Sequence, residues 1–249
     1  MNVELMTMAK LTMTAKFMLR TGSSDSGLMP NENIERMIFR FAAHDDGKTY
    51  PAVEVDSREE WLRILRERGA EDFKLILTDE IDDYSQLTVF NKIPCVILCF
   101  GQDYVSGWNR VWTINPVNNK WVVILVETII ENPPKDKPRF GDVSQDMATL
   151  LPRLRTLAQK LELSEFSFAF NAALKSLQAD FVRGDQMTPA HQRLLQAATD
   201  AYVFGGQGSW NDKGRAAAKE KGLTAEYEAL TKDLYRGIAL SLMYVVNEW

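Results

Sequence analysis

Side chains that could carry out acid–base or nucleophilic chemistry are scarce in this sequence. The chain has two histidines and two cysteines. His44 falls in a predicted turn beside two aspartates. His191 falls in the predicted first turn of a helix, where the helix dipole disfavours a charged imidazolium. Neither histidine accompanies a serine or cysteine in a recognisable nucleophile motif, so serine–histidine, cysteine–histidine and histidine–metal chemistry are not expected.

Cys95 and Cys99 stand four residues apart in the apolar segment PCVILCF, which is predicted to be a strand. Side chains at this spacing share one face of a strand about 13 Å apart, which is too far for a disulfide between them. A metal site would need further ligands near them. We interpret both as buried thiols, expect no metal and no cofactor, and take the cytoplasm as the expected location.

The segment TDEIDDYSQ (residues 78–86) places four carboxylates directly after a predicted strand. They are Asp79, Glu80, Asp82 and Asp83. Carboxylates at a strand end can hold Mg²⁺ or Ca²⁺, but this spacing is not that of a calcium loop. A solvated acidic loop, or an acidic contact surface for a basic partner, is the expectation. Glu127 and Glu131 could form a catalytic carboxylate pair, although no spacing argument singles them out.

A glycine-rich segment, FGGQGSWND (residues 204–212), interrupts a region that otherwise has a helical pattern. Its spacing matches neither the P-loop nor the dinucleotide-binding fingerprint. One interpretation ends a helix at the glycine pair, inserts the tryptophan into a bundle and uses the Asn-Asp pair to cap the next helix. The others are a partner-contact loop and a small anion site. The candidate binding residues are Gly205, Gly206, Gly208, Ser209, Trp210, Asn211 and Asp212.

Aromatic side chains gather in DYVSGWNRVWTINPVNNKWVV (residues 103–123), which contains a tyrosine and three tryptophans. Tryptophan is enriched at the centres of protein interfaces, and it is equally common in cross-strand pairs that cover a sheet. Both interpretations stay open from the sequence. The candidate contact residues are Trp108, Arg110 and Trp112.

The elements that would position these residues differ between the two halves of the chain. Alternating apolar residues predict strands at 10–21, 34–43, 50–55, 73–79, 87–90, 93–100, 110–116 and 120–130. Residues 44–50 and 115–120 are predicted turns of hairpins. Ser57 and Glu60 form a capping box for a helix that ends at Gly69.

Residues beyond the proline-rich segment ENPPKDKPRFG (131–141) have helical periodicity. Ser144, Ser164, Thr188 and Thr224 are the expected helix starts, and Pro152 is expected to kink the first helix or to mark its true start. The expected fold is α+β, with a mainly antiparallel sheet and one or two helices followed by about four helices. The expected domains are residues 1–132 and 143–249, joined by a connector at 133–142.

Charge and hydropathy restrict the possible partners. The net charge of −5 opposes binding to nucleic acid phosphates. The apolar runs are far shorter than the roughly 20 residues of a membrane span, and no signal peptide is expected at the N-terminus. The expected partner is therefore another protein, with a basic surface.

The segment AYVFGGQGSWND (residues 201–212) resembles a motif of uncharacterised bacterial families. Some of these small proteins are similar to immunity proteins, which neutralise a co-produced toxin by binding it. The resemblance implies a non-enzymatic inhibitor and brings no catalytic residues. Two alternatives stay open: an enzyme or sensor that binds a small phosphorylated or nucleotide ligand at residues 205–214, and a structural subunit of a phage or secretion assembly.

Overall fold

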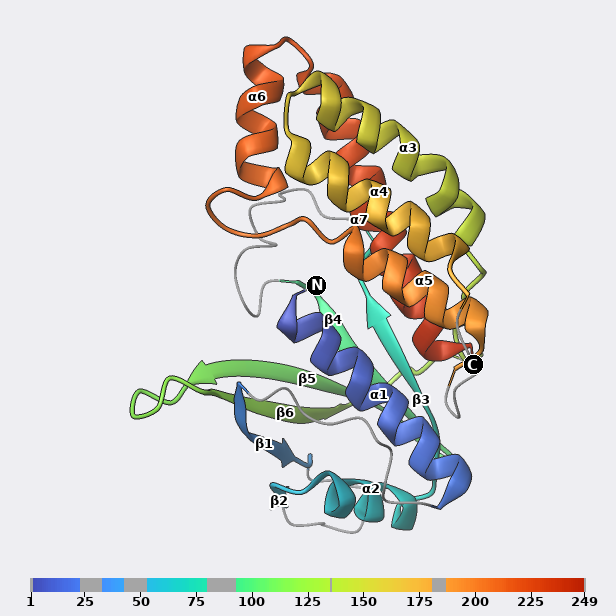
Figure 1. The fold of residues 1–249 in the computed structure, drawn as a ribbon. Helices are drawn as coiled ribbons and strands as arrows, with labels where there is room; N and C mark the ends of the chain where they lie inside the picture. Colours follow the sequence, from blue (N-terminus) through green and yellow to red (C-terminus); the bar gives the residue numbers. More distant parts are fainter. Residues whose placement is uncertain are drawn as a thin grey trace. The chain divides into compact units, whose positions relative to one another are not determined.

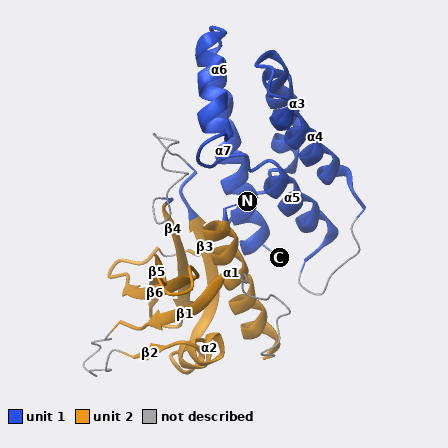
Figure 2. Cartoon of the chain, turned by 60° about the vertical axis from the view of Figure 1, so that its left-hand side comes forward, with its two compact units in different colours: residues 1–2, 77–93, 139–249 blue, residues 3–76, 94–138 orange. Residues whose placement is uncertain are grey.

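The computed structural model describes residues 2–22, 33–42, 53–79, 93–134, 136–180 and 187–248. The chain divides into two compact units (Figure 2). The sheet unit comprises residues 3–76 and 94–138, and the helical unit comprises residues 1–2, 77–93 and 139–249. The predicted α+β class is confirmed, since a six-stranded, mostly antiparallel sheet precedes a helical region.

The sheet has the strand order β2-β1-β6-β5-β4-β3 (Figure 1). Its strands are β1 (Ile34–Arg40), β2 (Glu54–Val55), β3 (Ala70–Leu77), β4 (Cys95–Gly101), β5 (Val105–Ile114) and β6 (Trp121–Ile129). β1 runs parallel to β6, whereas the pairs β1–β2, β4–β5 and β5–β6 are antiparallel. The predicted hairpin turn at 115–120 is confirmed by a hydrogen bond of 2.9 Å from Asn115 N to Lys120 O. The predicted turn at 44–50 and the predicted strand at 87–90 lie outside the described residues.

One face of the sheet packs against an aromatic core. Trp108 of β5 is fully buried and contacts the edge of Trp61, at 5.4 Å between ring centroids. Trp61 belongs to helix α2 (Arg58–Glu67) and stacks on Phe39 of β1 at 4.7 Å. The predicted start of α2 is confirmed, because the Ser57 side chain accepts from Glu60 N. Gly69 follows the helix with a φ of 82°, a backbone conformation that favours glycine.

The predicted strand at residues 10–21 is wrong, because these residues belong to helix α1 (Val3–Thr21). The alternation of apolar residues with threonine and lysine suggested an exposed polar face, but Thr12, Thr14 and Lys16 are also buried. The hydroxyl of Thr12 donates to Met8 O at 2.8 Å, one helical turn back. The strand prediction required one buried apolar face and one exposed polar face. Because these polar side chains are hydrogen-bonded and buried, that difference between the two faces does not exist.

The helical unit contains α3 (Ser144–Lys160), α4 (Ser164–Gln178), α5 (Pro189–Asp200), the short π-helix η2 (Trp210–Gly214), α6 (Arg215–Glu220) and α7 (Thr224–Asn247). Five α-helices are described there, one more than the four expected, because α6 was not anticipated. Thr188 caps α5 as predicted by accepting from His191 N. Ser144 does not cap α3; it lies inside the first turn, and Asp142 Oδ1 accepts from its backbone N at 2.8 Å.

Proline 152 lies within α3 and does not mark its start. Helices α3 and α7 pack against each other, as do the pairs α3–α4, α4–α5 and α5–α7. Among the described helices, none combines the length and apolar character that crossing a bilayer requires. The helical unit has several helix–helix seams, and the seam between α3 and α7 contains an open groove.

Candidate functional site

The glycine-rich loop at residues 204–212 is closed by hydrogen bonds to its own backbone. Asn211 Oδ1 accepts from Gly205 N, and Asn211 Nδ2 donates to Gly205 O, both at 3.0 Å. The Ser209 hydroxyl lies 2.9 Å from Gly205 O and 2.9 Å from Asn211 Oδ1. Asp212 Oδ2 accepts from Gly208 N at 2.7 Å. The polar side chains that could have held an anion are thus engaged within the loop.

The loop inserts Trp210 into the helical unit, as one sequence interpretation predicted. The Trp210 side chain is fully buried, and its ring meets Phe166 and Phe170 edge-on at centroid distances of 5.4 Å. Its indole Nε1 donates to Thr231 Oγ1 at 2.9 Å. The hydroxyl of Tyr227 donates to Trp210 O at 2.9 Å. This set of contacts explains why a tryptophan and polar loop residues occur together here.

Two details of that interpretation are wrong. The C-cap of α5 is Ala201, so Gly205 and Gly206 do not end that helix. Asn211 and Asp212 bond back to the loop instead of capping the following helix. The reason is geometric: the chain leaves α5 early and folds back, so that Trp210 N reaches Val203 O at 3.1 Å.

The aromatic candidates of the sheet unit lie in its interior. Trp108 is fully buried, and Trp112, 5% exposed, packs edge-on against Trp121 at 5.7 Å. Arg110 Nε donates to the buried Glu4 at 2.6 Å, and its Nη1 donates to Cys95 O at 2.9 Å. In this conformation, Trp108 contacts Trp61 of α2 and Arg110 contacts Glu4 of α1, so both offer little surface to a partner. They belong to a different unit from the glycine-rich loop.

The titratable groups singled out in the sequence are also engaged. Burial raises the pKa of both Cys95 and Cys99 to about 12, so neither is a thiolate at neutral pH. Glu127 is buried and accepts from Arg68 Nη1 at 3.0 Å and from Ala42 N at 3.1 Å. Within the described residues, no group of three or more His, Cys, Asp or Glu side chains could hold a metal ion.

His191 has a structural environment in the helical unit. Its ring stacks on Tyr244 at 5.0 Å, and its Nδ1 lies 2.6 Å from Thr188 Oγ1. Burial lowers the pKa of the imidazole, although Asp142 and Glu248 oppose this effect. The neutral ring is therefore favoured, in agreement with the sequence prediction for a histidine in the first turn of a helix. His44, Glu80, Asp82 and Asp83 lie outside the described residues.

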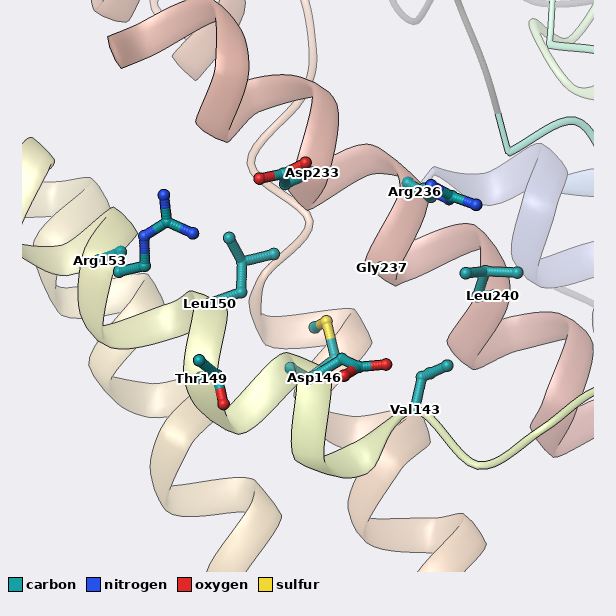
Figure 3. A pocket seen from close by; sticks show the side chains of 10 residues that line it. Val143, Asp146, Thr149, Leu150, Arg153, Asp233, Arg236, Gly237 and Leu240 are labelled. Carbon is teal, nitrogen blue, oxygen red and sulfur yellow. The ribbon is translucent and has the colours of Figure 1, made fainter.

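An open groove of about 500 Å³ runs between α3 and α7 (Figure 3). At Gly237, an added Cβ would lie 2.7 Å from Met147 Sδ. A glycine at this position allows α7 to approach α3 closely. The α3 side of the groove consists of Val143, Asp146, Met147, Thr149, Leu150 and Arg153, and the α7 side of Asp233, Arg236, Gly237 and Leu240.

Four charged side chains lie along this groove. Arg236 pairs with Asp79 at 3.3 Å, which places Asp79 of the predicted acidic segment near the groove. Asp146, Arg153 and Asp233 form no ion pair or side-chain hydrogen bond with any other residue that the structure describes. Arg153 and Asp233 lie toward one end of the groove, and Val143 and Leu240 toward the other (Figure 3).

The sequence analysis missed this groove. The residues on each helix recur at intervals of three and four, as expected for one face of a helix. That periodicity was visible, but it does not say which helix lies opposite. No protein-family model matches the chain, and comparisons with curated proteins and with solved structures gave no significant match. A function for this chain must therefore be inferred from its own sequence and geometry.

Proposed function

We propose that this protein is a non-enzymatic binding protein whose partner is another protein, and that the α3–α7 groove is the contact surface. The observation that supports the proposal is the set of charged groove side chains without partners in the described structure, Asp146, Arg153 and Asp233. By contrast, the thiols, His191 and Glu127 are buried. Polar groups exposed beside apolar side chains in a groove are typical of recognition sites.

The groove suits a protein segment better than a reacting substrate. It lies between two helices and mixes apolar side chains, such as Leu150 and Leu240, with charged ones. Grooves of this kind take helical segments of partner proteins. Catalysis would need a nucleophile or a general base directed at a bound substrate. Among the lining residues, only Asp146 and Asp233 could act as bases, and both are exposed carboxylates.

The specific form that we propose is an immunity- or antitoxin-like inhibitor in the bacterial cytoplasm. It would neutralise a toxin by covering part of the toxin's surface. The net charge of −5 favours a partner with a basic surface. The resemblance of residues 201–212 to bacterial families similar to immunity proteins supports the same class. The hydrogen-bonded loop stabilises the helical unit, so we place the contact at the groove and not at the loop.

Co-purification with the product of a neighbouring gene, combined with a toxicity assay, tests this proposal. The native protein should bind that product and protect cells that express it. The double variant Asp146→Lys/Asp233→Lys should lose both properties. Glu220→Lys/Glu228→Lys is the matched control, because it reverses two exposed carboxylates of the helical unit outside the groove. Equal protection by both double variants would refute the groove as the contact surface.

The two alternatives inferred from the sequence predict different results. A ligand site at residues 205–214 predicts a rise in melting temperature with nucleotides or sugar phosphates, and Ser209→Ala should abolish that rise. The loop hydrogen bonds of Ser209 and Asn211 argue against it. A subunit of a phage or secretion assembly predicts a large oligomer on a sizing column.

A further inference from the structure

The side chains of the groove indicate what kind of partner segment binds there. This inference rests on the proposed function. We propose that the α3–α7 groove binds a basic amphipathic helix of the partner, about three turns long. The helix would place an apolar stripe over the floor of the groove. Lysine or arginine side chains would flank that stripe and face Asp146 and Asp233.

The length of the occupant follows from the length of the groove. On α3, the lining residues extend from Val143 to Arg153. Ten residue steps at about 1.5 Å each give a groove of about 15 Å. A partner helix lying along it would make contact over about ten residues, or three turns. On α7, the lining residues extend from Asp233, toward the end that holds Arg153, to Leu240, toward the end that holds Val143 (Figure 3).

The apolar stripe of the occupant follows from the floor of the groove. Leu150 points from α3 toward α7, and Val143 and Leu240 lie toward one end (Figure 3). Between them, the buried Met147 side chain lies against Gly237, where an added Cβ would lie 2.7 Å from its sulfur, so the floor is closed and apolar there. Apolar residues at intervals of three and four on the partner would cover these positions.

The charge of the occupant follows from the side chains along the groove. Arg236 is already neutralised by Asp79 at 3.3 Å. Of the remaining charges, Asp146 and Asp233 are negative and Arg153 is positive, which leaves a net negative charge. The two carboxylates come from different helices, so both sides of a bound helix would meet one. Complementary basic residues would therefore flank the apolar stripe, with one acidic residue opposite Arg153.

Two synthetic helical peptides test this inference with the full-length chain. Both are stapled, fluorescein-labelled helices with leucines at intervals of three and four; one has flanking lysines and the other has flanking glutamates. Fluorescence anisotropy should show that the lysine peptide binds at least about tenfold more tightly. Its affinity should fall with added salt, and by about tenfold or more in Asp146→Lys/Asp233→Lys.

Two further variants keep the result interpretable. Glu220→Lys/Glu228→Lys should leave the affinity for the lysine peptide within about twofold of native. Asp146→Asn/Asp233→Asn removes the attraction without adding repulsion and should give an intermediate loss. Because all four residues are exposed, circular dichroism should show native helix content in each variant.

Several outcomes would overturn the inference. They are equal or tighter binding of the glutamate peptide, equal loss in the groove and control variants, and no binding of the lysine peptide at about 1 mM. If none of the peptides binds but a partner protein still requires the groove, the proposed function stands and the helical occupant is wrong. If the lysine peptide binds and no protein partner exists, the proposed function fails.

Discussion

Removal of the hydrogen bond between Trp210 and Thr231 should destabilise the helical unit by a few kcal/mol. Trp210 Nε1 donates to Thr231 Oγ1 at 2.9 Å, and both residues are buried. Trp210→Phe keeps an aromatic ring between Phe166 and Phe170 but deletes the donor. Thr231→Val keeps the side-chain shape and deletes the acceptor.

Each single variant leaves one polar group buried without its partner. Such a group costs about 1–3 kcal/mol. Trp210→Phe also removes ring atoms from a packed site, so we expect a total loss of about 2–4 kcal/mol. In the double variant, neither polar group remains. Its cost should therefore be smaller than the sum of the two single costs by about 2 kcal/mol.

Urea denaturation of the full-length variants, followed by far-ultraviolet circular dichroism, measures these free energies of unfolding. The urea midpoints should shift, while the slope of the unfolding free energy against urea concentration stays the same. Single-variant costs that add to within about 0.3 kcal/mol would show that the two residues are not coupled. That result would refute the stabilising role of the hydrogen bond from Trp210 to Thr231 in the helical unit.

Three further predictions concern stability. Gly214→Ala should cost about 1–3 kcal/mol in urea denaturation, because the new Cβ would lie 2.8 Å from the ring of the buried Tyr227; an unchanged midpoint would contradict this. Arg110→Ala should cost about 3–5 kcal/mol by leaving Glu4 buried without its guanidinium, whereas a residue that only contacts a partner would leave the midpoint unchanged. Burial lowers the pKa of Lys16 to about 8 despite the nearby Asp72. The buried ammonium therefore destabilises the folded state fully below pH 8, and this destabilisation decreases as the pH rises toward 10.5. The unfolding free energy of the native protein relative to Lys16→Met should therefore rise by about 3 kcal/mol between pH 8 and 10.5, and parallel pH curves for the two proteins would contradict this.

Local signals in the sequence predicted local features of the fold. Ser57 and Thr188 cap their helices as expected, because a cap depends on residues within one turn. The α+β class followed from the change between two-residue and helical periodicity near the proline-rich segment. The insertion of Trp210 was also predictable, since a large aromatic residue beside glycines needs a buried environment.

Features that depend on tertiary burial were not predictable. The alternation at residues 10–21 indicates a strand only if one face is exposed, and the burial of Thr12, Thr14 and Lys16 in α1 removes that condition. The groove needs two helices far apart in the sequence to lie side by side. Nothing near Gly237 indicates that its missing side chain accommodates Met147, ninety residues earlier in the chain.

Site-specific photo-crosslinking in cells shows whether a partner protein binds in the α3–α7 groove. A photoreactive amino acid replaces Thr149, which is exposed in the groove, or Lys175, which is exposed on α4 outside it. The Thr149 position should form one main adduct, mapped by mass spectrometry to a basic amphipathic helix of a single protein, and the Lys175 position should not. An adduct of equal yield from both positions, or none from Thr149, would show that the groove is not the contact surface.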